Sequence, residues 1–397
     1  MQRDPTTEVV TVDGVRPLGR LVRWCVERAY REQLRWAPAT YGLLYALVLR
    51  CAPARWLART IIVTCGARGL GRLIDTHAPD IVVSTYPATT AVLGALRRRG
   101  RLRVPTAAVV SDFAGVALWI DNAVDQHLVM YAQSHDEAAL RVGSNRVTCV
   151  PPLVDPAFTA DRAAAECRQA LGLSTEGPLV IVSGGGWAVG DLPAAVRAAL
   201  KSPDVRVACL AGRDLDARTQ LTTCFAGESR VTVLGFTNRM PELLCAADAL
   251  VHTTAGMTSL EALTCGCPVI AFAAPPGHPR LNADAMATAG LVARADDATQ
   301  LAGALQSILS RERPRPEVPA QQTDAATVVL TLRAIPIARR HMAATAARLA
   351  GATATSVTAA AGIGVLGEGD MRLPTIAAAM AVMASTLRRA ILVARPL

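Results

Sequence analysis

The stretch that decides the fold reads Leu179-Val-Ile-Val-Ser-Gly-Gly-Gly-Trp-Ala-Val-Gly190. Its first five residues predict a buried parallel strand, three glycines follow, and a helix is expected to begin near Asp191. Glycines let backbone N–H groups approach an anion, and a helix N-terminus carries about half a positive charge. The spacing is neither a dinucleotide fingerprint nor a Walker loop. It predicts a phosphate-binding loop, with a simple tight turn as the alternative.

A second loop of the same kind follows in Asp248-Ala-Leu-Val-His-Thr-Thr-Ala-Gly-Met-Thr-Ser-Leu-Glu-Ala262. Thr254, Gly256 and Thr258 come at the start of a predicted helix, where they could bind phosphate oxygens. Glu261 lies one turn further on, where it could accept hydrogen bonds from ribose hydroxyls. The alternative is a capping box, with Thr258 as N-cap and Glu261 three residues later.

Short β-branched runs alternate with alanine-rich helical stretches along the chain, which is typical of parallel sheets covered by helices. Strands are expected at 8–12, 80–84, 106–111, 126–130, 147–150, 179–183, 205–210, 231–234, 249–251, 268–272 and 291–293. The predicted fold class is therefore α/β, with two Rossmann-like domains facing a cleft. The predicted domains are residues 1–155 and 156–310, followed by a proline-rich linker, 311–323, and an alanine-rich helical or low-complexity tail, 324–397.

The chain has 397 residues and a net charge of +9, with 51% hydrophobic and 18% charged residues. That composition excludes a disordered chain, and the length suffices for two or three domains. Ten cysteines without a C-x-x-C pair favour reduced thiols and argue against a zinc site. No secretory signal is visible, and the resulting expectation is a cytoplasmic protein.

Positive charge is concentrated in residues 16–103, which hold 16 arginines and four acidic residues. Tryptophan and tyrosine lie among the first of these arginines, a makeup typical of a helix at an anionic membrane surface. The residues predicted to form a membrane or acceptor face are Arg23, Trp24, Arg31, Trp36, Arg97, Arg98 and Arg99. A solvated basic helix and general arginine usage are the alternatives. Nucleic acid is ranked below them because no nucleic-acid-binding module is visible.

Four motifs in a fixed order resemble the donor domain of family 28 glycosyltransferases with GT-B architecture. These motifs are Gly-Gly-Gly-Trp187, Gly235-Phe-Thr-Asn-Arg-Met240, Ala255-Gly-Met-Thr-Ser-Leu-Glu-Ala262 and Pro275-Pro-Gly-His-Pro-Arg-Leu-Asn282. The branch most similar is that of the diacylglycerol glycosyltransferases, including the monogalactosyldiacylglycerol synthases. The first half resembles them in Pro79–Pro87, Val110–Phe113 with Trp119, and Pro152–Phe158.

The resemblance implies inverting transfer of a hexosyl group from a UDP-sugar to a lipid acceptor, without metal or other cofactor, on the inner face of the cell membrane. Gly185, Gly186 and Thr258 would lie at the donor diphosphate, Phe236 and Met240 near the uracil, Glu261 at the ribose, and Asn282 in the sugar-facing loop. The full set of implied donor-binding residues is Gly184, Gly185, Gly186, Trp187, Gly235, Phe236, Met240, Thr254, Gly256, Thr258, Glu261 and Asn282.

Three departures from the family pattern concern catalysis. The chain is expected to begin at the second strand, 8–12, without the first strand and its glycine-rich loop. Val116 stands at a position where relatives carry histidine, and Gly277-His278-Pro279 replaces a Gly-Gln-Glu pattern. Asp112 and His278 are then the remaining acid–base candidates, with a structural cap and a solvent-exposed loop histidine as their alternatives. A non-catalytic UDP- or lipid-binding remnant, or an enzyme with a soluble or peptidoglycan-type acceptor, are the alternative functions.

Overall fold

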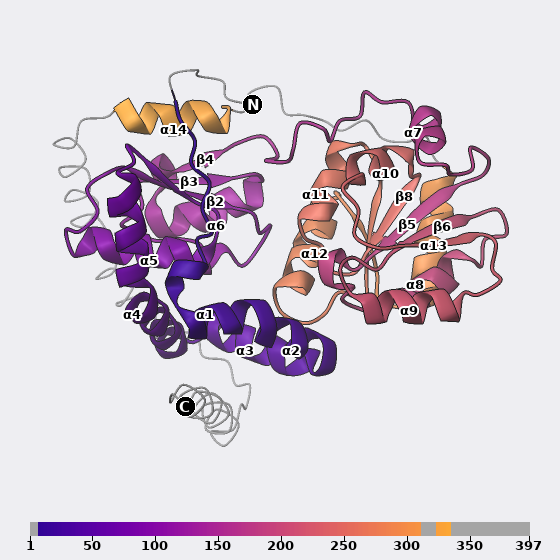
Figure 1. The fold of residues 1–397 in the computed structure, drawn as a ribbon, viewed down its shortest axis with the longest axis horizontal. Helices are drawn as coiled ribbons and strands as arrows, with labels where there is room; N and C mark the ends of the chain where they lie inside the picture. Colours follow the sequence, from indigo (N-terminus) through magenta and orange to yellow (C-terminus); the bar gives the residue numbers. More distant parts are fainter. Residues whose placement is uncertain (1–6, 311–322, 335–397) are drawn as a thin grey trace, which may run out of the picture.

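Two parallel sheets, each in its own half of the chain, form the framework of the protein (Figure 1). The computed structural model describes residues 7–310 and 323–334. The predicted linker and most of the predicted tail lie outside these residues. The predicted α/β fold with two Rossmann-like domains is confirmed.

The C-terminal sheet has six strands in the order β10-β9-β8-β5-β6-β7. They are β5 Leu179–Ser183, β6 Arg206–Leu210, β7 Val231–Leu234, β8 Ala249–His252, β9 Val269–Phe272 and β10 Ala293–Ala295. Counted within the domain this is the order 3-2-1-4-5-6, and the direction of winding reverses between β5 and β8. Ser183, the last residue of β5, lies opposite His252 of β8. The loops that leave these two strands therefore diverge from one point, where open α/β sheets bind ligands.

Alternate residues of β5 enter two different cores, as a strand buried on both faces requires. Ile181 packs with α7 Ala164–Ala170, α10 Met240–Ala246, α11 Met257–Thr264 and α12 His278–Thr288. Val180 and Val182 pack with α8 Leu192–Ala199, α9 Leu215–Cys224 and α13 Ala298–Leu309. All five residues of β5 are buried.

The N-terminal sheet has four strands paired in chain order, β1 Val82–Ser84, β2 Thr106–Val110, β3 Gln126–Val129 and β4 Val147–Cys149. The helices that accompany it are α5 Pro87–Arg98 and α6 Ala132–Val142, with the short turns η3 Val116–Leu118 and η4 Ser144–Arg146. Each strand pairs with the next one along the chain, so the winding does not reverse within the described residues. Among the described residues β1 stands at the edge of a continuous four-stranded sheet.

Residues 16–77 are helical and precede both sheets. They form η1 Arg16–Leu18, α1 Arg20–Trp24, a π-helical turn η2 Cys25–Ala29, α2 Tyr30–Trp36, α3 Pro38–Arg50 and α4 Ala52–His77. The predicted strand at 8–12 is wrong, because residues 7–12 have no regular structure and residues 8–12 are exposed. The β-branched run from Val9 to Val12 predicts a strand, but among the described residues no strand pairs with it.

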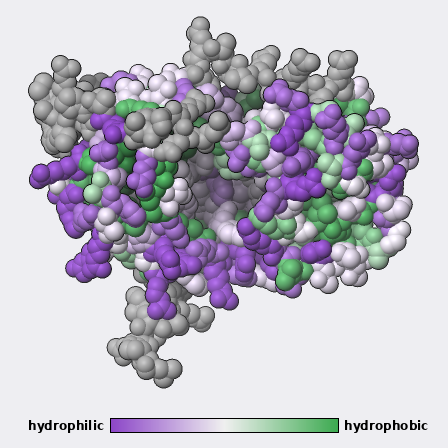
Figure 2. All heavy atoms as spheres, turned by 45° about the horizontal axis from the view of Figure 1, so that its top comes forward, coloured by the Kyte–Doolittle hydropathy of each residue, from purple (hydrophilic) through white to green (hydrophobic). Residues whose placement is uncertain are grey.

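The two domains contact each other directly, and helices α1–α3 lie below the gap between them in Figure 1. Phe113, from the loop after β2, is 3% exposed and belongs to the same core cluster as Ala283 and Met286 of α12. Leu260 of α11 packs with Leu128 and Met130 of the N-terminal sheet. Beyond the predicted linker, α14 Ala325–Ala334 packs onto this cluster as well. The surface is hollowed between the two halves (Figure 2).

Candidate active site

The first predicted anion loop, residues 184–190, leaves β5 at the switch point. Gly184 is close-packed, because an added Cβ would lie 2.4 Å from the carbonyl oxygen of Val189. Gly185 has a φ of +72° and its N–H donates to Ser183 Oγ at 3.2 Å. A Cβ on Gly186, by contrast, would have no atom within 4 Å. The loop thus combines a rigid base with open space above Gly186, as a phosphate cradle needs.

The second predicted anion loop, residues 253–256, leaves β8 beside the first. Thr253 Oγ1 donates to the Val189 carbonyl, which ties the two loops together. Helix α11 begins after Gly256, which is its N-cap, and no side chain caps this helix. Thr258 is therefore the second residue of the helix, and the capping-box alternative is wrong.

Glu261 is left without a structural role at the helix start. Its carboxylate interacts with Thr258, and burial raises the pKa of Glu261 above its usual value. The buried His252, the last residue of β8, accepts at Nδ1 from the N–H of Thr254 at 3.0 Å. His252 thus holds the start of the second loop through Thr254. Glu261 remains available for a ligand hydroxyl.

Phe236 and Trp187 are partly exposed, at 52% and 37%, on loops at the same end of the sheet. The Arg213 guanidinium carbon lies 3.5 Å above the centre of the Phe236 ring. The backbone N–H of Arg213 donates to the backbone carbonyl of Gly186 at 2.9 Å. Met240 packs against the C-terminal core at the start of α10, next to this edge. Arg213 is thus a candidate cation at the first predicted anion loop, and the sequence analysis missed it because no motif marks it.

Asp112 and His278 come from different domains and lie close enough for the Asp112 charge to act on the imidazole. His278 is the first residue of α12, and Asp112 follows β2. Asp112 Oδ2 accepts from Trp119 Nε1 at 2.8 Å, and Oδ1 accepts from Asn282 Nδ2 at 3.2 Å. Burial lowers the pKa of His278, while the Asp112 charge acts in the opposite direction.

Asn282 joins the domains. Its Oδ1 accepts from the N–H groups of Phe113 at 2.9 Å and Ala114 at 3.0 Å, while its Nδ2 donates to Asp112. The residue is 3% exposed. Three of the four hydrogen bonds that its amide can make therefore go to the N-terminal domain, and its predicted place in a sugar-facing loop stays a prediction.

Tyrosines surround the Asp112–His278 pair. The centres of the Tyr30, Tyr41 and Tyr45 rings each lie 5.9 Å from the centre of the His278 ring. Tyr30 also contacts Trp187, with ring centres 5.7 Å apart. Burial, followed by the Asp112 charge, raises the pKa of Tyr86 to about 12 and raises the pKa values of Tyr30 and Tyr45 as well. These phenols therefore stay protonated at neutral pH.

The predicted membrane segment is divided between two surroundings. Its tyrosines point into the cleft, whereas Trp24 and Trp36 are 43% and 74% exposed. Arg23 pairs with Glu27 at 2.9 Å and Arg31 with Glu32 at 3.3 Å, and all four side chains are exposed. The cleft tyrosines were thus missed by the sequence analysis. The four-residue spacing of Tyr41 and Tyr45, which places both on one helix face, is the signal that separates them from the tryptophans.

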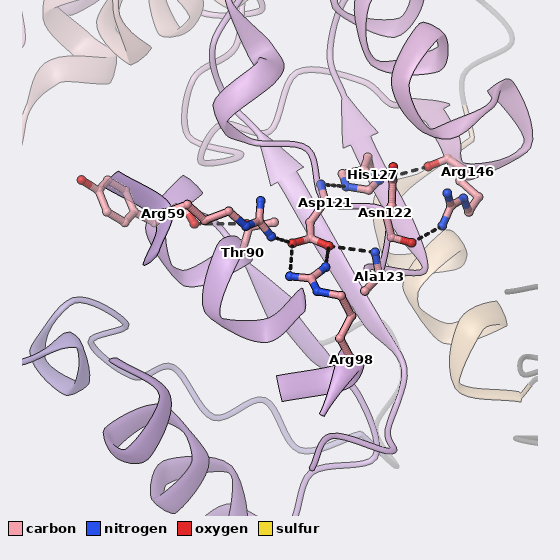
Figure 3. Close-up of polar contacts among 9 residues, drawn as sticks. Arg59, Thr90, Arg98, Asp121, Asn122, Ala123, His127 and Arg146 are labelled. Carbon is pink, nitrogen blue, oxygen red and sulfur yellow. Dashed lines mark hydrogen bonds and ion pairs between the residues drawn. The ribbon is translucent and has the colours of Figure 1, made fainter. Parts of the chain in front are cut away.

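Arg97 and Arg98, predicted to lie on a basic face, both pair with carboxylates of the N-terminal domain. Arg97 pairs with Asp125 at 2.6 Å. Arg98 and Arg59 converge on the carboxylate of Asp121, which is 1% exposed (Figure 3). The Arg59 and Arg98 side chains are 34% and 40% exposed, so only the carboxylate of this group is buried. Arg99, the third residue of this predicted group, is exposed after the end of α5.

No cluster of three or more metal-ligating side chains occurs within residues 7–310 and 323–334. Over the same residues, every helix is too short or too polar to cross a bilayer.

Known proteins resemble both halves of the chain. Residues 1–148 match the monogalactosyldiacylglycerol (MGDG) synthase family, and residues 182–311 match the family of glycosyl transferases group 1. The resemblance to the diacylglycerol glycosyltransferases is confirmed.

Individual relatives agree with the family matches. A processive diacylglycerol beta-glucosyltransferase of Bacillus subtilis is 27% identical over 225 residues, and that of Bacillus pumilus is 25% identical over 228. These alignments cover 55% and 56% of this chain, which spans only 58% of the length of each relative. Among solved structures, the UDP-GlcNAc 2-epimerase of Neisseria meningitidis has a TM-score of 0.50 at 13% identity. It covers 69% of this chain and 81% of its own, and supports the two-domain fold.

Proposed function

We propose that the protein is an inverting hexosyltransferase that moves a sugar from a UDP-sugar to the hydroxyl of a diacylglycerol-like lipid. The observation that carries this proposal is the pair of loops at the β5–β8 switch point, with Glu261 one turn into α11. Anions bind well at such points because loop N–H groups and helix N-termini stabilise their charge. The names of the relatives supply the chemical class of acceptor.

The roles of the residues follow from their places. The loops at Gly184–Gly186 and at Thr254–Thr258 bind the diphosphate, and Phe236 with Arg213 borders the uracil. Backbone donors and Arg213 stabilise the negative charge that develops on the leaving UDP, and this stabilisation is the main catalytic contribution. The reaction then requires neither a metal nor another cofactor. Asp112 and His278 stand across the cleft, where the acceptor hydroxyl must lose its proton.

The outer side of α1–α4 is proposed to rest on an anionic membrane surface, on the cytoplasmic side of the cell membrane. Trp24, Trp36 and Trp56 are all exposed, at 43%, 74% and 67%. Exposed tryptophan among arginines suits the lipid headgroup layer. Vesicles with and without anionic lipid test this proposal by co-sedimentation. Co-sedimentation that requires anionic lipid and decreases in Trp36→Ser supports the proposal. Co-sedimentation that changes neither with anionic lipid nor with the Trp36→Ser substitution favours a soluble acceptor.

Binding of UDP to the full chain tests the donor site. Glu261→Ala removes a charged partner of the ribose hydroxyls and is expected to weaken UDP affinity about tenfold to 100-fold, since such hydrogen bonds are worth about 1.5–3 kcal/mol. Thr258→Val is expected to weaken it about fivefold, through loss of one neutral hydrogen bond of about 1 kcal/mol. Isothermal titration calorimetry measures both.

Glu166→Ala is the matched control, because Glu166 is exposed on α7 of the same domain. It should leave UDP affinity unchanged. Equal affinity in all three variants and the wild type would show that UDP binds elsewhere. UDP binding without UDP release from any UDP-sugar and lipid pair would instead indicate a non-catalytic binding protein.

A further inference from the structure

His278 is held by two tyrosine hydroxyls, one at each ring nitrogen. Nδ1 lies 2.6 Å from the hydroxyl of Tyr41, and Nε2 lies 3.4 Å from the hydroxyl of Tyr30. Both tyrosines belong to the N-terminal helices, on α3 and α2, whereas His278 opens α12 of the other domain. The imidazole is therefore fixed only when the two domains meet.

The backbone is shaped for this contact. Gly277, the N-cap of α12, has a φ of +101°, and a Cβ there would lie 2.4 Å from the Tyr41 ring. A Cβ on Gly42 would likewise lie 2.4 Å from Cβ of Pro276. Two glycines, one on each side, thus let α3 and the loop before α12 approach at close range. Arg35 adds an ion pair to Asp214 of the C-terminal domain at 3.5 Å.

The two hydrogen bonds are unequal, and the difference assigns them different roles. The bond to Tyr41 is short, so it fixes the ring. The bond to Tyr30 is at the limit of hydrogen-bonding distance, and Tyr30 is half-buried beside the partly exposed Trp187 of the diphosphate loop. Tyr30 therefore contacts both His278 and a residue of the loop proposed to bind the donor.

We propose that Tyr30 relays the proton of the acceptor hydroxyl to His278, and that Tyr41 positions His278 for this by accepting a hydrogen bond from its Nδ1–H. This inference rests on the proposed function, which it extends by naming the proton path. With Nδ1 protonated, Nε2 carries the lone pair and accepts from the Tyr30 hydroxyl. Tyr30 contacts the substrate and is catalytic, whereas Tyr41 acts through His278.

The acceptor oxygen forms a bond to the anomeric carbon, and the bond from that carbon to the diphosphate oxygen breaks, with its electron pair leaving on UDP. The acceptor proton passes to the Tyr30 oxygen while the proton of Tyr30 passes to Nε2. His278 becomes an imidazolium, which the nearby Asp112 carboxylate stabilises, and it loses the proton to solvent when the products leave.

The tautomer of His278 tests the positioning role without turnover. In the full chain labelled with ¹⁵N-histidine, protonated and unprotonated ring nitrogens resonate far apart, and comparison with His278→Gln assigns the signal. The wild type is expected to show protonated Nδ1 and unprotonated Nε2. Tyr41→Phe should lose this preference. Tyr45→Phe is the matched control, because its ring contacts His278 and no hydrogen bond between the two is present in the structure. A wild-type Nε2–H tautomer, or no change in Tyr41→Phe, would overturn the assignment.

Turnover tests the relay. Tyr30→Phe is expected to lower kcat about 100-fold, within the usual contribution of general acid–base catalysis, and to change UDP affinity less than twofold. Tyr41→Phe should lower kcat about tenfold, and Tyr45→Phe less than twofold. Unchanged kcat in Tyr30→Phe would overturn the relay while leaving the proposed function intact. A wild type that binds UDP but transfers no sugar would instead overturn the proposed function, and the tautomer measurement would still decide the role of Tyr41.

Discussion

The two sheets of this protein build their halves of the cleft in different ways. The C-terminal sheet reverses its winding between β5 and β8, so two neighbouring loops diverge and expose the backbone of a glycine-rich turn. The N-terminal sheet pairs its described strands in simple succession and has no such reversal. Its contribution to the cleft comes from Asp112 after β2 and from tyrosines on helices that precede the sheet.

This difference separates a local site from an assembled one. The donor loops are short, contiguous stretches whose function depends on glycine and on helix starts. The proposed acceptor side needs Tyr30, Tyr41, Asp112 and His278 to come together, and these residues come from both domains. A substitution in the C-terminal loops should therefore act mainly on UDP binding. A substitution in the N-terminal domain should act mainly on stability and on the contact between the domains.

The largest expected effect is in the N-terminal domain, at Asp121 (Figure 3). Asp121→Ala leaves Arg59 and Arg98 without their shared buried carboxylate and removes the acceptor of the Ala123 N–H. Because the carboxylate is buried while both guanidinium groups are partly exposed, we expect a cost between the about 0–1 kcal/mol of an exposed pair and the about 3–5 kcal/mol of a fully buried one. We therefore expect the N-terminal domain of this variant to unfold at a lower urea concentration than that of the wild type.

Asp284→Ala supplies the comparison, because it breaks an exposed pair with Arg294 in the C-terminal domain. Exposed pairs contribute about 0–1 kcal/mol. A cost of similar size in both variants would mean that the Asp121 cluster does not stabilise its domain more than a surface pair does.

A smaller effect is expected from glycines of the first donor loop. Gly184→Ala places a methyl group 2.4 Å from a carbonyl oxygen, and overpacking of this kind costs about 1–3 kcal/mol. It should therefore lower both stability and UDP affinity. Gly186→Ala meets no atom within 4 Å, so it should lower UDP affinity alone.

Calorimetry for UDP and thermal unfolding for stability separate the two variants. Gly303→Ala on α13 also meets no atom within 4 Å and lies far from the loop in sequence, which makes it a control for both measurements. If Gly186→Ala bound UDP as tightly as Gly303→Ala, the diphosphate could not lie over the first loop.

The third prediction concerns one buried histidine in each sheet, His127 of β3 and His252 of β8. Burial lowers both pKa values from 6.5 to about 4. Between these values the unfolded chain binds a proton that the folded chain does not. The free energy of unfolding should therefore fall as pH decreases from about 6.5 to about 4, by about 1.4 kcal/mol per pH unit for each histidine.

Two substitutions assign the slope to its domain. His127→Gln keeps an acceptor at the position of Nε2, which receives the Asp121 N–H at 3.3 Å. His252→Asn keeps one at the position of Nδ1, which receives the Thr254 N–H at 3.0 Å. Each variant should remove its own share of the slope in urea unfolding at several pH values. An unchanged slope in both would show that these histidines take up protons when folded.

The sequence alone determined the α/β class and nearly all strands of both sheets. The predicted strand at 179–183 coincides with β5, and the strand at 231–234 with β7. Buried parallel strands are continuous apolar runs, so they can be recognised from the sequence alone. The same holds for the glycine loops, which lie within a few residues of the strand that presents them.

Only the tertiary structure decided where the other side chains lie. Tyr41 and Trp36 belong to one basic aromatic segment in the sequence, yet one lies against His278 and the other is 74% exposed. In the sequence, Arg97 and Arg98 belong to a run of basic residues. In the structure they form ion pairs with Asp125 and Asp121, respectively. Asn282 joins the domains through groups about 170 residues away in the chain. Contacts across such separations leave no local pattern, because they depend on how whole helices pack and not on spacing within one element.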